Sequence, residues 1–237
     1  MSLTAARLRN SLVGRWRKYL GRPLGRAAQL ATRRARISRY LASHGAPALI
    51  LGAGPQRRDG WLASDLQPRN GSVVYIDACR PLPFPDGSLA FVFAEHMVEH
   101  IAYEQGASLA SEVLRVLRPG GVFRIATPDL QAIARLVLPP VDPAALRYVE
   151  AFNRVFGRPD DSAAVVANRA LRWWGHQFVY DETTLRDLLE RAGFATIERM
   201  AVGQSFHAML QDLEGHGDVI GQEMNRYETM VLEATKR

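Results

Sequence analysis

The sequence predicts an α/β fold built around a mainly parallel sheet, and three observations support this. Leu49–Leu51 run directly into Gly52-Ala53-Gly54, as a buried strand entering a tight turn does. From Pro47 onward, further apolar runs alternate with segments of helical periodicity, which implies right-handed crossovers between parallel strands. The chain has 237 residues, of which 47% are hydrophobic, enough for one good core. It has no apolar run long enough to predict a membrane span.

Residues 1–43 are expected to form a basic helical extension ahead of a domain at 44–237. Residues 1–58 hold thirteen of the 30 Lys and Arg residues and none of the 24 Asp and Glu residues. Apolar residues recur every fourth position within 3–21, and a second basic helix is expected over roughly 26–43. Such an extension is a solvated appendage, an anchor to an anionic membrane surface or a transit peptide. Nucleic acid is disfavoured as a partner because no recognition module accompanies the charge.

The remaining elements follow in order along the chain. The expected strands are 49–51, 61–65, 73–76, 89–94, 122–126, 195–200 and 227–234. The expected helices are 107–117, stopped by Pro119-Gly120-Gly121, and 183–192, between Asp181 and Gly193. Residues 130–175 read as a helical insert after the fifth strand, which we expect to cap the sheet edge where ligands bind in open α/β folds. Residues 203–221 read as a loop.

The glycine turn predicts close backbone approach to a small anionic group, because glycine readily adopts positive φ. A dinucleotide fingerprint would need a third glycine where Arg57 stands, and Pro55 removes an N–H that a pyrophosphate would use. An NAD-dependent oxidoreductase is therefore the weakest alternative. Asp65 and Asp77 end the next two strands, and together with the turn they favour an adenosine-like ligand. Either acid alone is more often an ordinary turn residue.

Glu95 and His96 follow the fourth strand and are expected to face that ligand. His96-Met97-Val98-Glu99-His100 also matches an inverted zinc-protease string. The string directly follows a buried strand and no third ligand is obvious, so we expect no metal. The later histidines, including His176, are more often packing residues than bases. Cys79 is the single cysteine, which fits a reducing compartment.

Taken together, these stretches resemble the class I S-adenosylmethionine-dependent methyltransferases. The motifs that carry the resemblance are Leu51-Gly52-Ala53-Gly54, Asp65, Asp77, Pro81–Ser88, Glu95–His100, Arg115–Gly121, Gly175–Asp181 and Leu188–Phe194. The resemblance covers roughly residues 47–237 and implies a Rossmann-like seven-stranded sheet with its last strand antiparallel. It is nearest to small bacterial methyltransferases linked to cell-surface polysaccharide pathways.

The resemblance also implies the site. S-Adenosylmethionine would lie with its methionine part against Gly52, Ala53 and Gly54. Asp65 would hold the ribose hydroxyls and Asp77 the adenine amine. Glu95 and His96 would lie near the methyl group.

The implied activity is methyl transfer to an unidentified acceptor, such as a glycan or another small molecule, in the cytoplasm or peripherally on the membrane. His96 is the first candidate for a general base and His176 the second. Ile50 and Ala90 stand where such proteins often carry acids. This departure motivates the alternative of a non-catalytic binding or scaffold protein at the membrane surface.

Overall fold

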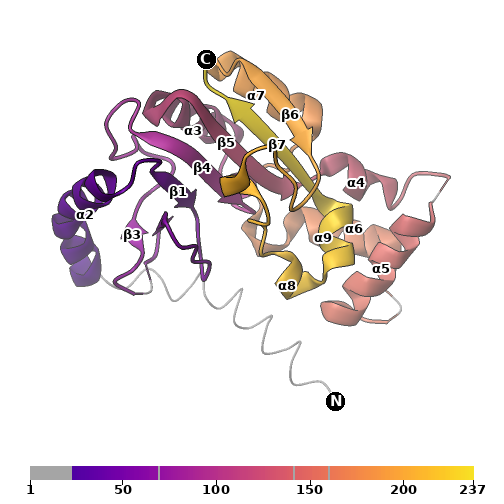
Figure 1. Cartoon of the computed structure of the whole chain (residues 1–237). Coiled ribbons are helices and arrows are strands. Elements are labelled where there is room, and N and C mark those ends of the chain that lie inside the picture. Colours follow the sequence, from indigo (N-terminus) through magenta and orange to yellow (C-terminus); the bar gives the residue numbers. More distant parts are fainter. Residues whose placement is uncertain (1–22, 69, 141, 160) are drawn as a thin grey trace.

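A computed structural model describes residues 23–68, 70–140, 142–159 and 161–237 (Figure 1). The helix expected over 3–21 lies outside these residues. The strands are β1 (Ala48–Leu51), β2 (Trp61–Asp65), β3 (Val74–Tyr75), β4 (Leu89–Glu95), β5 (Leu117–Pro128), β6 (Thr196–Met200) and β7 (Thr229–Thr235). The longer helices are α2 (Pro23–Ser43), α3 (Tyr103–Val116), α5 (Pro143–Val155), α6 (Ala163–Arg172) and α7 (Glu182–Ala192). The shorter ones are α4 (Leu130–Arg135), α8 (Gly217–Ile220), α9 (Gln222–Glu228) and the 3-10 turns η1 (Val98–His100), η2 (Trp173–Gly175) and η3 (Ala208–Leu210).

The seven strands form one sheet in the order β3-β2-β1-β4-β5-β7-β6. Neighbouring strands from β3 to β5 are parallel, and β7 runs antiparallel to both β5 and β6. This confirms the Rossmann-like methyltransferase sheet and its antiparallel last strand. Because the first five strands are parallel, their carboxyl ends meet at one edge, where the strand order reverses between β1 and β4.

The expected alternation of strands and helices is wrong for the first half of the sheet. β1, β2, β3 and β4 follow one another through turns and loops, with no helix between them in the residues that the structure describes. The connections are short, and the glycine turn takes up part of the connection from β1 to β2. The helices that cover this part of the sheet come from elsewhere in the chain.

Two later boundaries also differ from expectation. α3 ends at Val116, as the Pro119-Gly120-Gly121 signal predicts. β5 begins at the next residue, however, and includes these three residues. A shift in the register with β4, between Leu89 and Phe91, accommodates them as an irregularity. The segment expected as a strand from residue 227 begins instead with the end of α9, and β7 starts at Thr229.

One face of the sheet is covered by helices. Leu49, Leu51, Phe123 and Ile125 pack on this face with the buried side chains of α3 and α7. α2 joins the same core through Ile37, and the Arg36 guanidinium donates to the Val73 carbonyl at 3.0 Å. Part of the segment expected as a separate extension, residues 23–43, therefore packs against the sheet.

The other face is covered by the loop that follows β6. Ile50, Phe93 and Val122 contact Leu210 and Leu213 of this loop in a second apolar cluster. The segment read from the sequence as a simple loop therefore forms a layer of the fold. The segment expected as a helical insert contains α4, α5, α6 and η2, which pack with Ile220 and Met224 of α8 and α9 in a third cluster at one end of the sheet (Figure 1). No helix in the described part of the chain is both long and apolar enough to cross a membrane.

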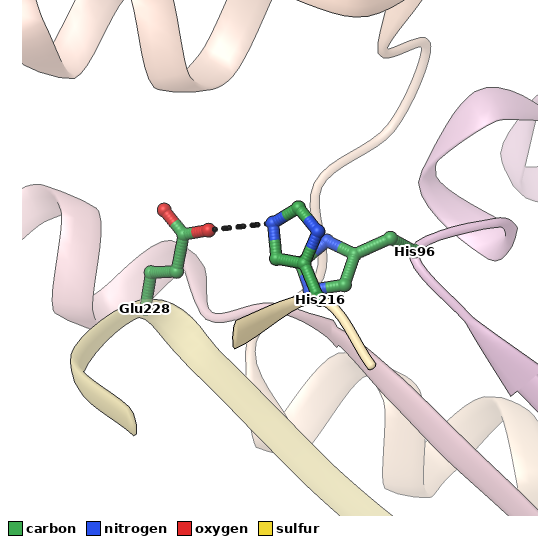
Figure 2. Close-up of side chains that lie close together, drawn as sticks. All are labelled: His96, His216 and Glu228. Carbon is green, nitrogen blue, oxygen red and sulfur yellow. Dashed lines mark ion pairs between the residues drawn. The ribbon is translucent and has the colours of Figure 1, made fainter. Parts of the chain in front are cut away.

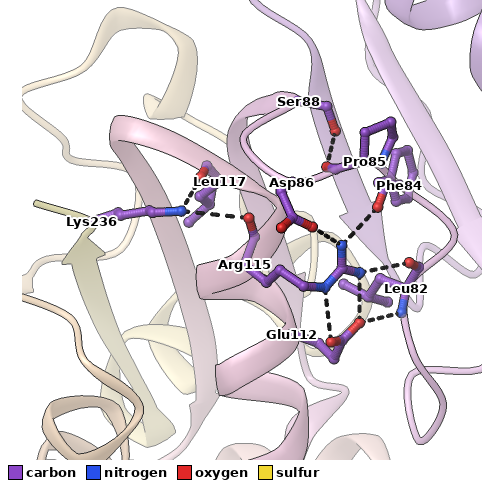
Figure 3. A network of polar contacts seen from close by, with 9 residues as sticks. All are labelled: Leu82, Phe84, Pro85, Asp86, Ser88, Glu112, Arg115, Leu117 and Lys236. Atoms are coloured by element: carbon purple, nitrogen blue, oxygen red, sulfur yellow. Dashed lines mark hydrogen bonds and ion pairs between the residues drawn. The ribbon is translucent and has the colours of Figure 1, made fainter.

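Arg115 fastens the connection before β4 to α3. Its guanidinium donates to the carbonyls of Leu82 and Phe84 and forms ion pairs with Glu112 at 2.8 Å and Asp86 at 2.7 Å (Figure 3). Hydrogen bonds to Glu112 and Asp86 raise the pKa of Arg115 further above its usual value. The Arg-Val-Leu-Arg-Pro-Gly-Gly motif thus has a structural role here, because it holds Pro81 and Pro83 beside the end of β3.

Gly106 provides a test of the packing between α3 and Tyr180. A Cβ atom at residue 106 would lie 2.4 Å from the Tyr180 hydroxyl oxygen. Helix propensity alone would make Gly106→Ala about 1 kcal/mol more stable. We expect a loss of about 1–3 kcal/mol instead, measured by urea denaturation, because the tyrosine must move. Tyr180→Phe should rescue the variant, and Ser108→Ala on the exposed side of α3 should change little. A more stable Gly106→Ala would contradict this packing.

Candidate active site

The glycine turn lies at the carboxyl end of β1 and is held by β2. Gly52 and Gly54 have φ values of 65° and 51°, which only glycine adopts without strain. The Gly54 N–H donates to Asp65 Oδ2 at 2.9 Å, and the Ala53 N–H donates to the Ser64 carbonyl at 2.8 Å. A Cβ at Gly52 would lie 2.5 Å from Met97 Cγ, whereas a Cβ at Gly54 would meet nothing within 4 Å. The turn therefore leaves open space at Gly54.

Asp65 and Asp77 lie at the same edge, as predicted. Asp65 Oδ1 also accepts from the Gln67 N–H at 2.7 Å, so its carboxylate is fixed at the end of β2. Asp77 Oδ1 accepts from the Cys79 N–H at 3.0 Å. Asp77 also borders a cavity of about 210 Å³ between α2 and the end of β3. The cavity is lined by Leu30, Arg33, Tyr75, Ile76, Asp77, Arg80, Pro81 and Pro83.

Glu95 joins the glycine turn to the loop after β6. It is 9% exposed and accepts from the Gln56 side chain, from the Gly215 N–H at 3.1 Å and from the His216 N–H at 2.9 Å. Residues far apart in the sequence thus meet on one carboxylate at the end of β4. Its predicted role in holding the cofactor stays a prediction.

His96 is held in a strained conformation at the end of β4. Its φ of 44° lies in the left-handed region, which costs a non-glycine residue about 1 kcal/mol or more. Nδ1 lies 3.3 Å from Glu99 Oε1, and Nε2 lies 3.1 Å from Thr229 Oγ1, whose own hydrogen goes to Asn225. Both ring nitrogens therefore face acceptors, which favours the protonated ring. Burial lowers the pKa of His96, but the hydrogen bond to Glu99 and nearby carboxylates outweigh burial and raise it overall.

Glu99 is fully buried beneath the histidines. Its Oε2 accepts from the Thr127 hydroxyl at 3.0 Å, and its Oε1 lies 3.3 Å from His96 Nδ1 and 4.0 Å from His100 Nε2. Burial raises the pKa of Glu99. The hydrogen bond from His96 and electrostatic interactions with His96, His100 and His176 outweigh it and lower the pKa to about 2. Glu99 is therefore ionised at neutral pH.

His216, Glu228 and His176 complete the cluster around His96 and Glu99, and only His176 was among the predicted site residues. His216, from the loop after β6, stacks on His96 with ring centroids 3.7 Å apart, and its Nε2 lies 3.3 Å from Glu228 Oε1 (Figure 2). His176 lies on the other side of the cluster, with its ring centroid 5.0 Å from that of His100. Burial lowers the pKa of His176, and the charge of Glu99 only partly opposes this. No local pattern links these residues, since they come from separate segments.

The structure thus brings all the predicted site residues to the carboxyl edge of the sheet, in two groups. The glycine turn, Asp65 and Asp77 line one side, where β1, β2 and β3 end. The second group, at the ends of β4 and β5, contains Glu95, His96 and His176. Glu95 bridges the groups through Gln56 of the turn. The residues that sequence reasoning missed in the second group are Glu99, His216 and Glu228.

Comparisons with known proteins agree with this fold. A family model described as a methyltransferase domain matches residues 29–125. A protein of Mycolicibacterium smegmatis, described as a probable S-adenosylmethionine-dependent methyltransferase, is 48% identical over 48 residues. That alignment covers 20% of this chain and 18% of the relative, so the chain matches less than a fifth of this curated relative's length.

Two solved structures are among those similar to this chain. A SAM dependent methyltransferase from Archaeoglobus fulgidus is 18% identical with a TM-score of 0.48, and the match covers 89% of this chain and 94% of that one. An S-adenosylmethionine dependent methyltransferase from Mesorhizobium loti is 19% identical with a TM-score of 0.48, over 81% and 92% of the two chains.

The family match shows that residues 29–125 are similar to a methyltransferase domain. The strand order of the sheet is the one that the resemblance to the class I S-adenosylmethionine-dependent methyltransferases implied. The domain match begins at residue 29, inside α2, which agrees with the packing of that helix on the sheet.

Proposed function

We propose that this protein transfers a methyl group from S-adenosylmethionine to a small-molecule or glycan acceptor. The observation that carries the proposal is the hydrogen bond from the Gly54 N–H to Asp65, which joins the glycine turn to the end of β2. It places an open backbone turn and a fixed carboxylate at the point where the strand order reverses, the usual ligand position in open α/β sheets.

The residues present fit the parts of this cofactor. Open space at Gly54 leaves room for the amino-acid end. Asp65 keeps lone pairs for ribose hydroxyls after accepting two backbone hydrogen bonds. The cavity at Asp77, about 210 Å³, is smaller than the roughly 300–1,000 Å³ of a whole ligand site and suits one part of a ligand, here the adenine ring. Arg115 supports this wall through its hydrogen bonds to the connection that carries Pro81 and Pro83.

The cofactor, when bound, supplies an electrophilic methyl group, and the protein's task is to position the acceptor and exclude water. Alignment of two bound reactants can lower a barrier by roughly 7–11 kcal/mol. His96 remains the first candidate for the general base, a role that needs the neutral ring with Nε2 released from Thr229, while Glu99 orients the ring from Nδ1. His176 remains the second candidate for this role.

The finer parts of the proposal concern the acceptor and the location. A glycan acceptor from a cell-surface polysaccharide pathway, and contact of residues 1–43 with an anionic membrane, both remain proposals. Arg34 and Arg39 of α2 are exposed and leave a basic surface for such contact. Neither a non-catalytic scaffold nor an NAD-dependent oxidoreductase is favoured by any contact in the described residues.

Calorimetry with S-adenosylhomocysteine tests the cofactor site. We expect the wild-type protein to bind one equivalent and Gly54→Val to lose binding, because φ of 51° and a side chain in the open space both act against the turn. Gly45→Val, at an exposed glycine where a Cβ also meets open space, is the control for the added side chain. Labelled S-adenosylmethionine with fractionated cell extract then tests transfer. A wild-type protein that binds no cofactor would contradict the proposal.

A further inference from the structure

We propose that Glu99, His100 and His176 bind one divalent transition-metal ion at the carboxyl edge of the sheet. Each offers one ligand atom, and these atoms all lie within 4.8 Å of one another. Two imidazoles and one carboxylate form a ligand set found in catalytic zinc and non-haem iron sites, which keep positions open. His176 is the third ligand that the His96–His100 string lacked in the sequence.

The two histidine rings have the geometry of a shared ion. A metal lies about 2.1 Å from an imidazole nitrogen and therefore about 3.2 Å from the ring centroid. Two rings at a tetrahedral angle then have centroids about 5 Å apart. The centroids of His100 and His176 are 5.0 Å apart, and their planes meet at 73°. The three ligand atoms, which lie within 4.8 Å of one another, would move closer together by side-chain rotation on binding one ion.

The main chain holds the two segments together without any metal. The Gln177 N–H donates to the Glu99 carbonyl at 2.7 Å, and the Phe178 N–H donates to the same oxygen at 3.2 Å. The Gln177 side chain also donates to the His100 carbonyl at 2.6 Å. These bonds attach the segment after η2 to η1 and set His176 beside His100. The ligands are therefore preorganised by the fold.

The charge at Glu99 also favours an ion. Its side chain is fully buried, and buried charges in proteins are paired or coordinate metals. Thr127 fixes Oε2, so Oε1 faces the histidines. His96 contacts the same Oε1 and would orient the carboxylate as a partner of the site, in the way outer residues orient metal ligands. Nδ1 of His176 is buried without a hydrogen-bond partner among the described residues.

A second group of possible ligands, His96, His216 and Glu228, fits an ion less well. The rings of His96 and His216 are stacked 3.7 Å apart at 30°, so their nitrogen lone pairs do not converge on one point (Figure 2). Glu228 is already engaged, since it pairs with His216 and accepts from the Tyr148 hydroxyl. This group therefore serves as the internal comparison.

The ion has a chemical use that rests on the proposed function. Its open positions would hold oxygen atoms of the methyl acceptor, and a metal lowers the pKa of a bound hydroxyl. The acceptor class would then be a compound with an oxygen nucleophile, held next to His96.

Metal binding is measured on the full chain after a chelator and desalting. The protein is mixed separately with Zn²⁺, Mn²⁺ and Mg²⁺, and the metal retained through gel filtration is quantified. We expect one equivalent of Zn²⁺ or Mn²⁺ and no retained Mg²⁺, because imidazole ligands disfavour Mg²⁺. Co²⁺ should give a visible absorption band from histidine and carboxylate ligands. Retention of no ion, or of Mg²⁺ alone, would overturn the proposal.

Variants assign the ligands. Glu99→Gln keeps the shape of the side chain, and both it and His176→Asn should weaken binding by about a hundredfold or more, since changes beside metal ligands alone cost 10–100-fold. His44→Asn, at the end of α2, and His216→Asn should retain the ion. If His216→Asn lost the ion and His176→Asn retained it, the ligands would be His96, His216 and Glu228 instead of the proposed group. If a chelator did not affect transfer of the label, the ion would have no role in the reaction. If the protein bound the ion but did not bind the cofactor, the proposed function would be contradicted instead.

Discussion

Replacing Arg124 with Met should lower the free energy of unfolding by about 3–5 kcal/mol. Arg124 is fully buried on β5, with Nε 2.7 Å from Glu214 and Nη1 2.5 Å from Glu233. Nη1 also donates to the Gln204 carbonyl at 2.8 Å. The substitution leaves two buried carboxylates without their cation, which costs more than the ion pairs themselves contribute. Urea denaturation followed by tryptophan fluorescence measures the loss.

A surface pair provides the matched control. Arg147 lies 2.8 Å from Glu223, with the two side chains 57% and 67% exposed, so Arg147→Met should change the free energy of unfolding by less than about 1 kcal/mol. Combining Arg124→Met with Glu214→Gln and Glu233→Gln should recover much of the loss, because no unpaired charge remains. Equal effects of Arg124→Met and Arg147→Met would show that burial of the network is not what stabilises it.

The Arg124 network also illustrates what sequence alone could not predict. Glu214 lies in the loop after β6, and its bond to the Gly203 N–H closes that loop over the second face of the sheet. The loop reads as irregular because it has no hydrophobic period, yet Leu210 and Leu213 bury themselves by contacts that only the tertiary fold supplies. A buried arginine in a strand likewise gives no signal in the sequence, because its partners are known only from the tertiary fold.

The candidate site was predictable where its residues belong to strand ends. Parallel strands align their carboxyl ends, so the glycine turn, Asp65, Asp77 and Glu95 could be placed together from order alone. The helices expected between the first four strands were not there because the connections, such as residues 52–60 between β1 and β2, hold too few residues for both a helix and the return of the chain. Thr229 and His216, which contact His96, were not predictable because they reach it from the far end of the chain.

Asp65→Ala should weaken binding of S-adenosylhomocysteine about a hundredfold, or about 2.7 kcal/mol. The Asp65 carboxylate has two roles in this prediction. It accepts the Gly54 and Gln67 N–H groups at 2.9 and 2.7 Å, which fixes the turn, and it is expected to accept the ribose hydroxyls. Hydrogen bonds to charged groups contribute about 1.5–3 kcal/mol each, so losing this carboxylate exceeds the loss of one neutral contact. Isothermal calorimetry measures the affinity.

Two variants separate these roles of Asp65. Asp65→Asn keeps one acceptor oxygen for the Gly54 N–H but loses the charge, so its affinity should fall between those of the wild type and Asp65→Ala. Asp59→Asn changes an exposed acid on the same β1–β2 connection and should bind as the wild type does. If Asp65→Ala kept wild-type affinity, the ribose would have to lie elsewhere, and the glycine turn would need no carboxylate to hold its shape. An affinity loss in Asp59→Asn of the same size would instead trace the effect to the net charge of the turn rather than to the hydrogen bonds of Asp65.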